Sequence, residues 1–236
     1  MKPFRVILPI AALALTAPGI ALSAGADDPL LTMLNVEQLE WRDANEGDVM
    51  AWGAQGWVGY DLDKFWFKSE GEQLEGDTEA AELQLLYGRA IDPNWDLQLG
   101  LRYDFEPEDN QKWLTLGVQG LAPYYIETEL SLFVGEEGQN LLRLEAEYEL
   151  MLTQRLVLSP ELEMSIYSDD DESREIGSGL SSMELGLRLA YEVKREFAPY
   201  IGINWEKKFG NTADFAKEEG EDTDDLQFVA GVRFWF

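Results

Sequence analysis

The chain has 236 residues and a formal net charge of −28, with 46 acidic against 18 basic side chains. This charge argues against a nucleic-acid partner or an anionic lipid surface, because both are themselves negative. Cysteine and histidine are absent, which excludes disulfides, thiolate metal sites and the side chain that most often serves as a general base.

Residues 1–26 have the organisation of a secretory signal peptide. They combine a positive start at Lys2 and Arg5, an apolar middle and a small-residue cleavage site at Ala24-Gly25-Ala26. The apolar stretch is too short to span a bilayer comfortably, and no later segment approaches 18 uninterrupted apolar residues. The sequence therefore predicts export of residues 27–236 as one domain and excludes a helical membrane protein.

Beyond residue 30, apolar and polar side chains alternate with period two, the spacing of a strand with two different faces. Leu142 and Leu144, for example, flank Arg143. Twelve segments carry this pattern, and most have about the ten residues that a tilted strand needs to cross a bilayer. The predicted strands are residues 33–43, 49–60, 63–71, 79–90, 94–104, 111–121, 124–134, 140–151, 154–167, 181–193, 197–208 and 226–236.

The predicted connections alternate between short and long. Asp61-Leu62 and Asp92-Pro93 are short, whereas the acidic segments 168–180 and 209–225 are long. Short periplasmic turns and long external loops are typical of outer-membrane barrels, and an even strand count places both termini in the periplasm. We therefore predict an all-β protein, a single up-and-down antiparallel transmembrane β-barrel of about 12 strands in the outer membrane of a Gram-negative cell.

Alternation by itself leaves a second arrangement open, a lipocalin-type barrel with its apolar side chains inward. The signal peptide, the loop asymmetry and the aromatic C-terminus favour the membrane barrel. Phe228, Phe234 and Phe236 share one face of the last strand, and an exposed aromatic ladder of this kind suits contact with lipid. We expect these three residues to form the outer-membrane insertion signal used by the barrel-assembly machinery.

The opposite face of three consecutive strands is acidic. Its glutamates are candidate metal ligands, because carboxylate oxygens suit hard cations; they are Glu127, Glu129, Glu145, Glu147, Glu149, Glu161 and Glu163. Four arginines are predicted as counter-charges in the lumen, namely Arg143, Arg155, Arg188 and Arg233. Two interpretations stay open, a charge network that fills a narrow barrel and a patch that attracts cations.

Two methionines near the N-terminal edge, Met33 and Met50, are further metal candidates because thioether sulfur favours Cu(I). Catalysis is not expected, since serine and acyl-transfer mechanisms usually need a histidine beside the nucleophile. The acidic residues of the long loops are interpreted as solvated, or as bridged by divalent cations to lipopolysaccharide phosphates.

Several short motifs follow one another in order along residues 33–236. They include Asp48-Val49-Met50-Ala51-Trp52, Gly56-Trp57-Val58-Gly59 and Phe197-Ala198-Pro199-Tyr200-Ile201-Gly202. Together they resemble the copper-resistance protein B family (CopB/PcoB). The resemblance implies an outer-membrane protein of bacterial copper resistance, encoded with a periplasmic multicopper oxidase and thought to bind or pass copper. Family members commonly carry a Met- and His-rich segment before the barrel, whereas residues 27–32 contain neither residue type.

We accordingly expect a monomeric, non-enzymatic outer-membrane barrel of copper homeostasis. It would bind or conduct copper ions or dock a periplasmic multicopper oxidase, with outer-membrane lipid around its wall. The alternative is a general cation-preferring porin for small solutes, without copper specificity.

Overall fold

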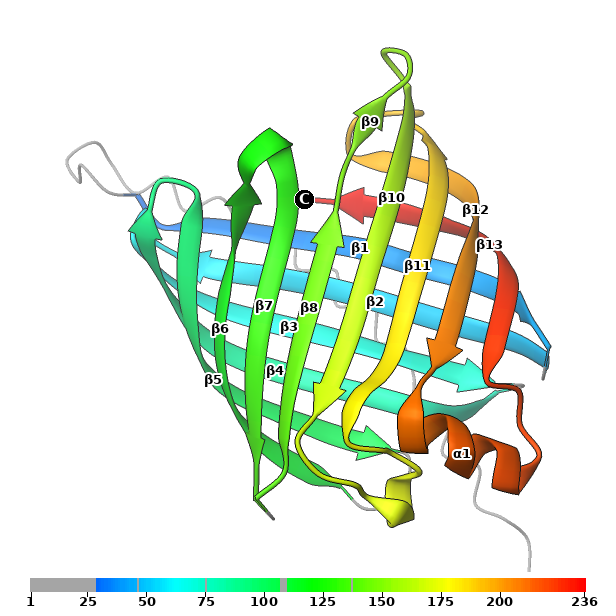
Figure 1. Cartoon of the computed structure of the whole chain (residues 1–236). Helices are drawn as coiled ribbons and strands as arrows, with labels where there is room; N and C mark the ends of the chain where they lie inside the picture. Colours follow the sequence, from blue (N-terminus) through cyan, green and yellow to red (C-terminus); the bar gives the residue numbers. More distant parts are fainter. Residues whose placement is uncertain (1–28, 46, 75, 107–109, 137) are drawn as a thin grey trace, which may run out of the picture.

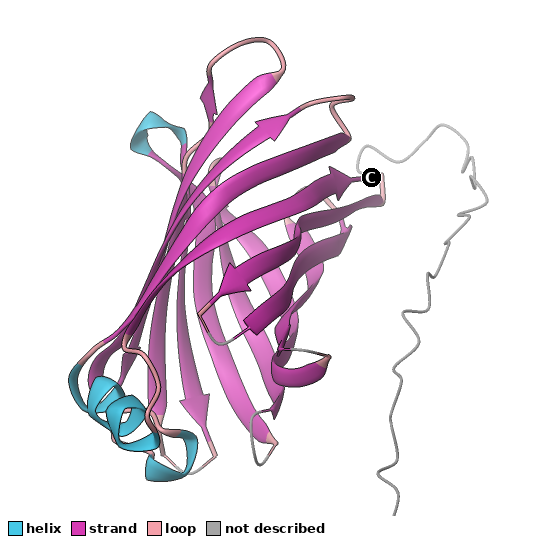
Figure 2. Ribbon diagram, turned by 90° about the vertical axis from the view of Figure 1, so that its right-hand side faces the viewer, coloured by secondary structure: helices cyan, strands magenta, loops and turns pink. Residues whose placement is uncertain are grey.

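The computed structural model describes residues 29–45, 47–74, 76–106, 110–136 and 138–236. The predicted signal peptide lies outside them. The described chain forms one antiparallel sheet that closes on itself (Figures 1 and 2). Its strands are β1 (Leu31–Ala44), β2 (Gly47–Gly59), β3 (Asp63–Leu74), β4 (Asp77–Asp92), β5 (Trp95–Glu106), β6 (Gln111–Ala122), β7 (Ile126–Gly135), β8 (Asn140–Glu147), β9 (Leu150–Met151), β10 (Leu156–Tyr167), β11 (Gly179–Tyr191), β12 (Phe197–Lys208) and β13 (Asp224–Trp235). The helical segments are η1 (Pro123–Tyr125), η2 (Glu172–Arg174) and α1 (Gly210–Glu219).

The sheet is an up-and-down barrel of twelve strands, which confirms the predicted fold class. Consecutive strands pair with each other, and β1 pairs with β13 to close the cylinder. β8 and β9 count as one strand, because both pair with β10 in the same direction. Closure leaves no open sheet edge, the condition for crossing a bilayer as strands.

The break between β8 and β9 has a local cause in β10. Tyr148 donates its backbone N–H to the carbonyl oxygen of Pro160 at 3.1 Å. Proline has no N–H with which to return a bond, so the ladder is interrupted at this pair. The sequence pattern predicted one strand over residues 140–151, and Pro160 divides it.

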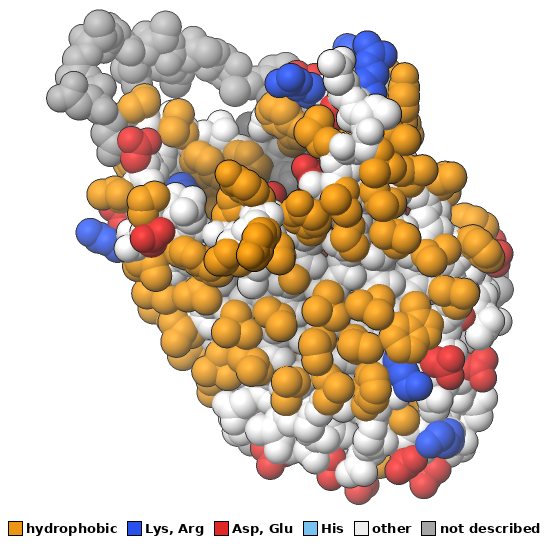
Figure 3. Space-filling view, turned by 45° about the horizontal axis from the view of Figure 1, so that its top comes forward, with side chains coloured by type: hydrophobic (Ala, Val, Ile, Leu, Met, Phe, Trp, Pro, Cys, Tyr) orange, Lys and Arg blue, Asp and Glu red, His pale blue; other side chains and the backbone are white. Residues whose placement is uncertain are grey.

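Side chains alternate between the two faces of the barrel, with the apolar set outside. Leu101 is 62% exposed, whereas its neighbours along β5, Gln98 and Arg102, are buried in the interior. Figure 3 shows hydrophobic side chains spread over the wall, with charged side chains mainly toward the upper and lower ends of the view. The alternative barrel with an apolar interior is therefore wrong. Among the described residues, no helix combines the length and the apolar composition needed to cross a membrane.

The two ends of the barrel differ. β1 begins and β13 ends at the same end, which also carries the short connections such as residues 93–94; we call it the terminus end (Figure 1). The opposite end carries the connections 168–178 and 209–223, and we call it the loop end. This alternation of short and long connections follows the predicted pattern.

Part of the predicted acidic loop over residues 209–225 is the helix α1, which the sequence pattern did not predict. Its buried residues are Thr212, Ala213 and Ala216. The helix ends at Gly220, whose φ of 88° supplies the left-handed conformation that closes the last turn. With so few apolar side chains, the segment has too weak a periodicity to reveal a helix.

Candidate functional site

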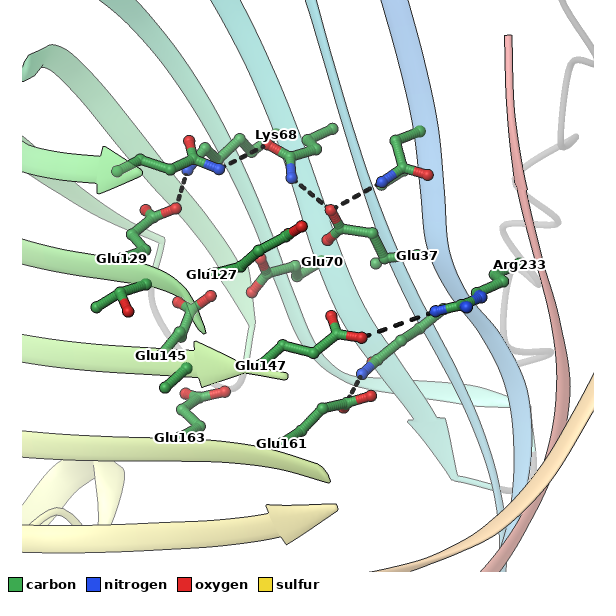
Figure 4. A pocket seen from close by; sticks show the side chains of 18 of the residues that line it. Glu37, Lys68, Glu70, Glu127, Glu129, Glu145, Glu147, Glu161, Glu163 and Arg233 are labelled. Atoms are coloured by element: carbon green, nitrogen blue, oxygen red, sulfur yellow. Dashed lines mark hydrogen bonds and ion pairs between the residues drawn. The ribbon is translucent and has the colours of Figure 1, made fainter. Parts of the chain in front are cut away.

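The barrel encloses a cavity of about 1320 Å³ that is lined from both walls. Its lining contains 17 carboxylates and nine basic side chains, so the lining is strongly negative. Figure 4 shows the glutamates of β7, β8 and β10 pointing into this space toward the opposite wall. All seven predicted lumen glutamates are part of the lining, namely Glu127, Glu129, Glu145, Glu147, Glu149, Glu161 and Glu163.

One ion pair joins the two walls directly. Lys68 of β3 reaches across the cavity to Glu129 of β7, and both side chains are buried (Figure 4). Ser131 on the same strand donates its hydroxyl to the Glu129 carboxylate at 3.0 Å. A buried charge is tolerated only when it is paired and hydrogen-bonded, and this pair meets both conditions.

Arg143 of β8 lies among four carboxylates. Its guanidinium nitrogens are 3.0 Å from Glu82, 3.3 Å from Glu70, 3.4 Å from Glu163 and 3.9 Å from Glu145. Glu70 and Glu82 come from β3 and β4, so Arg143 also ties one wall to the other. A single guanidinium with several donors suits this role better than an ammonium group would.

A second buried arginine, Arg102 of β5, extends this network toward the loop end. It binds Glu82 at 2.8 Å and Asp104 at 2.6 Å. The indole N–H of Trp113 donates to Asp104 at 2.8 Å, and the Arg174 guanidinium of η2 lies 3.7 Å away from the same carboxylate. A connection of the loop end is thereby attached to the barrel interior.

Glu40 of β1 is the centre of another network. This carboxylate is 1% exposed and accepts hydrogen bonds from Arg42 at 2.8 Å, Arg188 at 2.8 Å and Tyr200 at 2.9 Å. Arg188 also pairs with Glu161, one of the predicted glutamates. The network therefore connects β1 with β10, β11 and β12 inside the lumen.

Arg143, Arg188 and Arg233 line the cavity, and Arg233 pairs with Glu147 at 3.7 Å and with Glu149 at 2.8 Å. Arg155 does not belong to this group. It lies in the turn before β10, its side chain is exposed, and it is outside the lining. The turn ends only at residue 156, so Arg155 projects beyond the strand and supplies no charge to the lumen.

The methionine candidates do not form a common site. Met33 is paired with Trp57, which lies seven residues from Met50 along β2. At about 3.3 Å per residue the two methionines are roughly 23 Å apart. Neither lines the cavity, and Met50 is exposed. They cannot bind one ion together.

The cavity lining offers oxygen donors to a cation. Carboxylates, amides and hydroxyls are present in the lining, whereas the lining residues include no methionine. Within the part of the chain that is described, no group of three or more acidic, histidine or cysteine side chains is arranged to hold a metal ion. The geometry is that of a charged lumen in which carboxylates share arginines and a lysine.

Phe234 and Phe236 lie at the terminus end, whereas Phe228 pairs with Asp43 of β1 and lies toward the loop end. Phe228 and Phe236 are exposed, and Phe234 is half-buried with its ring edge-on to Phe236 at 5.8 Å between centroids. The neighbouring Trp235 donates its indole N–H to the carbonyl oxygen of Arg195 at 2.9 Å. Their role as an insertion signal stays a prediction.

The sequence pattern did not reveal the carboxylates that the opposite wall contributes, above all Glu40, Glu82 and Asp104. A local signal existed, because Glu40 is two residues before Arg42 and Asp104 is two residues after Arg102. Residues two apart on a strand share a face, so the two members of each pair are expected to face the lumen together.

Comparison with known proteins identifies the family. The family model described as "Copper resistance protein B precursor (CopB)" matches residues 30–236. The chain belongs to the copper resistance protein B family. Copper resistance protein B of Escherichia coli is 48% identical over 210 residues, which are 89% of this chain and 71% of that protein. A copper resistance protein B homolog of Pseudomonas syringae pv. tomato is 44% identical over 210 residues, which are 89% of this chain and 71% of that protein.

Solved structures similar to this barrel are porins. The NanC porin superposes with a TM-score of 0.57 and 12% identity, covering 85% of this chain and 98% of that porin. The KdgM porin in complex with disordered oligogalacturonate gives a TM-score of 0.52 and 11% identity, covering 86% and 99%. At this level of identity the likeness concerns the fold. The predicted family and the predicted barrel fold of this chain are both confirmed.

Proposed function

We propose that the chain is an outer-membrane barrel of bacterial copper resistance whose acidic lumen binds or conducts copper ions. The family match over residues 30–236 supports the copper role. The observation that carries the lumen's part in it is the cavity lining, in which 17 carboxylates face nine basic side chains. Low-dielectric walls around one sign of charge concentrate ions of the opposite sign.

The donor chemistry favours Cu(II) over Cu(I) as the ion that the lumen accepts. Soft thioether and thiolate ligands select Cu(I), and the cavity lining provides oxygen atoms. Among divalent first-row ions, Cu²⁺ binds most tightly to sites of a given donor set. Metal counting on refolded protein tests this: Cu²⁺ is expected to be retained in excess over Ag⁺, a redox-stable substitute for Cu⁺. Preferential retention of Ag⁺ would contradict it.

The proposed orientation places the terminus end in the periplasm and the loop end outside the cell. Short turns at one end and long loops at the other support it. The leucine-rich wall would contact outer-membrane lipid around a single chain. A periplasmic multicopper oxidase, implied by the family resemblance, would dock at the terminus end. A non-enzymatic role agrees with this assignment.

A cation-preferring porin without copper specificity is the second candidate, favoured by the likeness to the NanC and KdgM porins. Growth of a deletion strain in copper, zinc and cobalt separates the two functions. Copper resistance predicts sensitivity to copper alone, restored by the intact gene. Equal changes in tolerance to all three metals would favour the porin and overturn the copper-specific role.

A further inference from the structure

The cavity reaches the two ends of the barrel unequally. At the terminus end its lining includes residues of several connections, such as Asp61, Asn94 and Arg195. At the loop end, the connections that are described contribute Arg174 alone to the lining. The cavity is therefore a vestibule that extends to several turns of the terminus end and, among the described loop-end connections, reaches only Arg174.

Aromatic and arginine side chains fill the barrel where the vestibule ends. Trp113 and Phe133, with Leu141 beside them, form a fully buried cluster inside the sheet. The Arg102 guanidinium lies 4.6 Å from the Phe133 ring centre and that of Arg143 lies 5.6 Å from it. Two arginines over one ring gain cation–π attraction while their carboxylate partners balance their charge.

A loop-end connection reinforces this layer. Arg174 of η2 contacts Asp104 of β5 and donates to the side-chain oxygen of Gln111 of β6. Three residues earlier, Asp171 accepts a hydrogen bond from Gln139 at 2.8 Å. The connection 168–178 is thereby joined to β5 and β6 through Arg174 and to Gln139, just before β8, through Asp171.

The helix α1 packs at the loop end against β11 and the connection 168–178. The Thr212 hydroxyl lies 2.8 Å from the Ser181 hydroxyl of β11 and accepts the backbone N–H of Gly177 at 2.8 Å. Ala213 and Ala216 on the same helix are buried. The two long connections that the structure describes are therefore joined to each other and to β11 at this end of the barrel.

We propose that Arg102, Trp113, Phe133, Arg143 and Arg174 form a partition that determines which solutes cross the barrel and from which side cations enter. Cations enter the vestibule from the terminus end, and the partition bars bulk solute from the loop end. This goes beyond the proposed copper role, because it applies to any ion. A porin-like barrel that is open to solutes at both ends is incompatible with this partition.

The absence of cysteine from the chain allows a direct test with single introduced thiols. Gln55→Cys places a thiol in the vestibule lining, and Glu218→Cys places one on the exposed face of α1 as the control. Oriented proteoliposomes are treated from either side with a membrane-impermeant cationic methanethiosulfonate. We expect Gln55→Cys to react at least about tenfold faster from the terminus end, and Glu218→Cys to show the opposite preference. Equal rates at Gln55→Cys from both sides would overturn the partition.

Opening the partition is the complementary test. In the Gln55→Cys background, Phe133→Ala together with Arg174→Ala is expected to raise the loop-side reaction rate about tenfold. Heat-modifiable electrophoretic migration checks that the barrel is folded; if the double variant does not fold, Arg174→Ala alone is measured for the same rise. A folded variant with an unchanged loop-side rate would show that these residues are not the barrier. The assays contain no copper, so their failure leaves the copper role to the metal-counting and growth experiments.

Discussion

Single charged residues organise the interior of this barrel, and Glu40 is the clearest example. It is fully enclosed by Arg42, Arg188 and Tyr200, which come from two different sections of the chain. Removing one member of a buried charge network leaves the others without compensation, and this costs more than the network contributes as a whole. The structural importance of a lumen glutamate therefore depends on its partners.

This argument gives a prediction for two glutamates of the same strand. Glu40→Gln is expected to lower the free energy of unfolding by about 3 kcal/mol, because two buried guanidinium groups lose their shared carboxylate. Glu37→Gln is the matched control, since Glu37 is bound by the neutral amides of Asn35 and Gln55; it is expected to cost about 1 kcal/mol or less. Urea titration of detergent-refolded protein measures both. Equal losses would show that the arginine partners do not matter.

At the scale of the elements, strand positions followed from the sequence and the interactions between loops did not. Alternation located all twelve strands, because a strand with an apolar outer face and a polar face toward a charged lumen has a period of two. α1 has no such pattern. It is held in place by contacts with a distant connection, such as the hydrogen bonds from Asn211 to Asp170 at 3.1 Å.

Asp170 makes this contact between loops sensitive to acid. The backbone N–H of Ser178 donates to its carboxylate at 2.6 Å and, with the Ser178 and Asn211 side chains, holds the pKa of Asp170 below its ordinary value of 3.8. A lowered folded-state pKa means that the stabilisation is complete above pH 3.8 and is lost as the pH falls through the lower folded value.

Hydrogen exchange measures the consequence. Below pH 3.8, amide exchange in residues 170–178 and 210–219, corrected for the intrinsic pH dependence, is expected to rise while the barrel strands stay protected. Asp170→Asn removes the titrating group, so the variant should show no such pH step. A step of the same size in Asp170→Asn would assign the acid sensitivity to another residue.

At the scale of the whole molecule, the distribution of charge is the property most closely tied to function. The terminus side of the vestibule carries Glu145, Glu147 and Glu149 on one segment, opposed by Arg233 from β13. Since the protein wall around the vestibule has a low dielectric constant, the field inside it is stronger than the same charges would produce at an open surface.

Replacing Glu145, Glu147 and Glu149 by Gln should weaken that field. The measured quantity is the ratio of the reaction rates of Gln55→Cys with cationic and with anionic methanethiosulfonate from the terminus end. We expect the ratio to fall by about tenfold. An unchanged ratio would remove the role of this segment in attracting cations.

The matched control moves the same change of charge to the loop end. Asp214→Asn, Glu218→Gln and Glu219→Gln neutralise three exposed residues of α1. Because exposed charges are screened by salt over about 8–10 Å, the ratio at Gln55→Cys should not change. A similar fall in the control would indicate an effect of net charge and not of the vestibule.

The sequence by itself determined the strand positions and the division of each strand into a leucine-rich and a polar face, because both follow from alternation along a single strand. Alternation left open which face is outside; the signal peptide, the loop asymmetry and the aromatic C-terminus favoured leucines outside, and the closed barrel has them there. Only the tertiary structure decided which charges meet. Arg188 and Glu40 are 148 residues apart, and Lys68 and Glu129 are 61 apart; closure of β1 onto β13 and the register of each ladder bring them together. The partition at the loop end and the docking of α1 arise in the same way, from side chains of separate strands and loops that converge on one end of a closed cylinder.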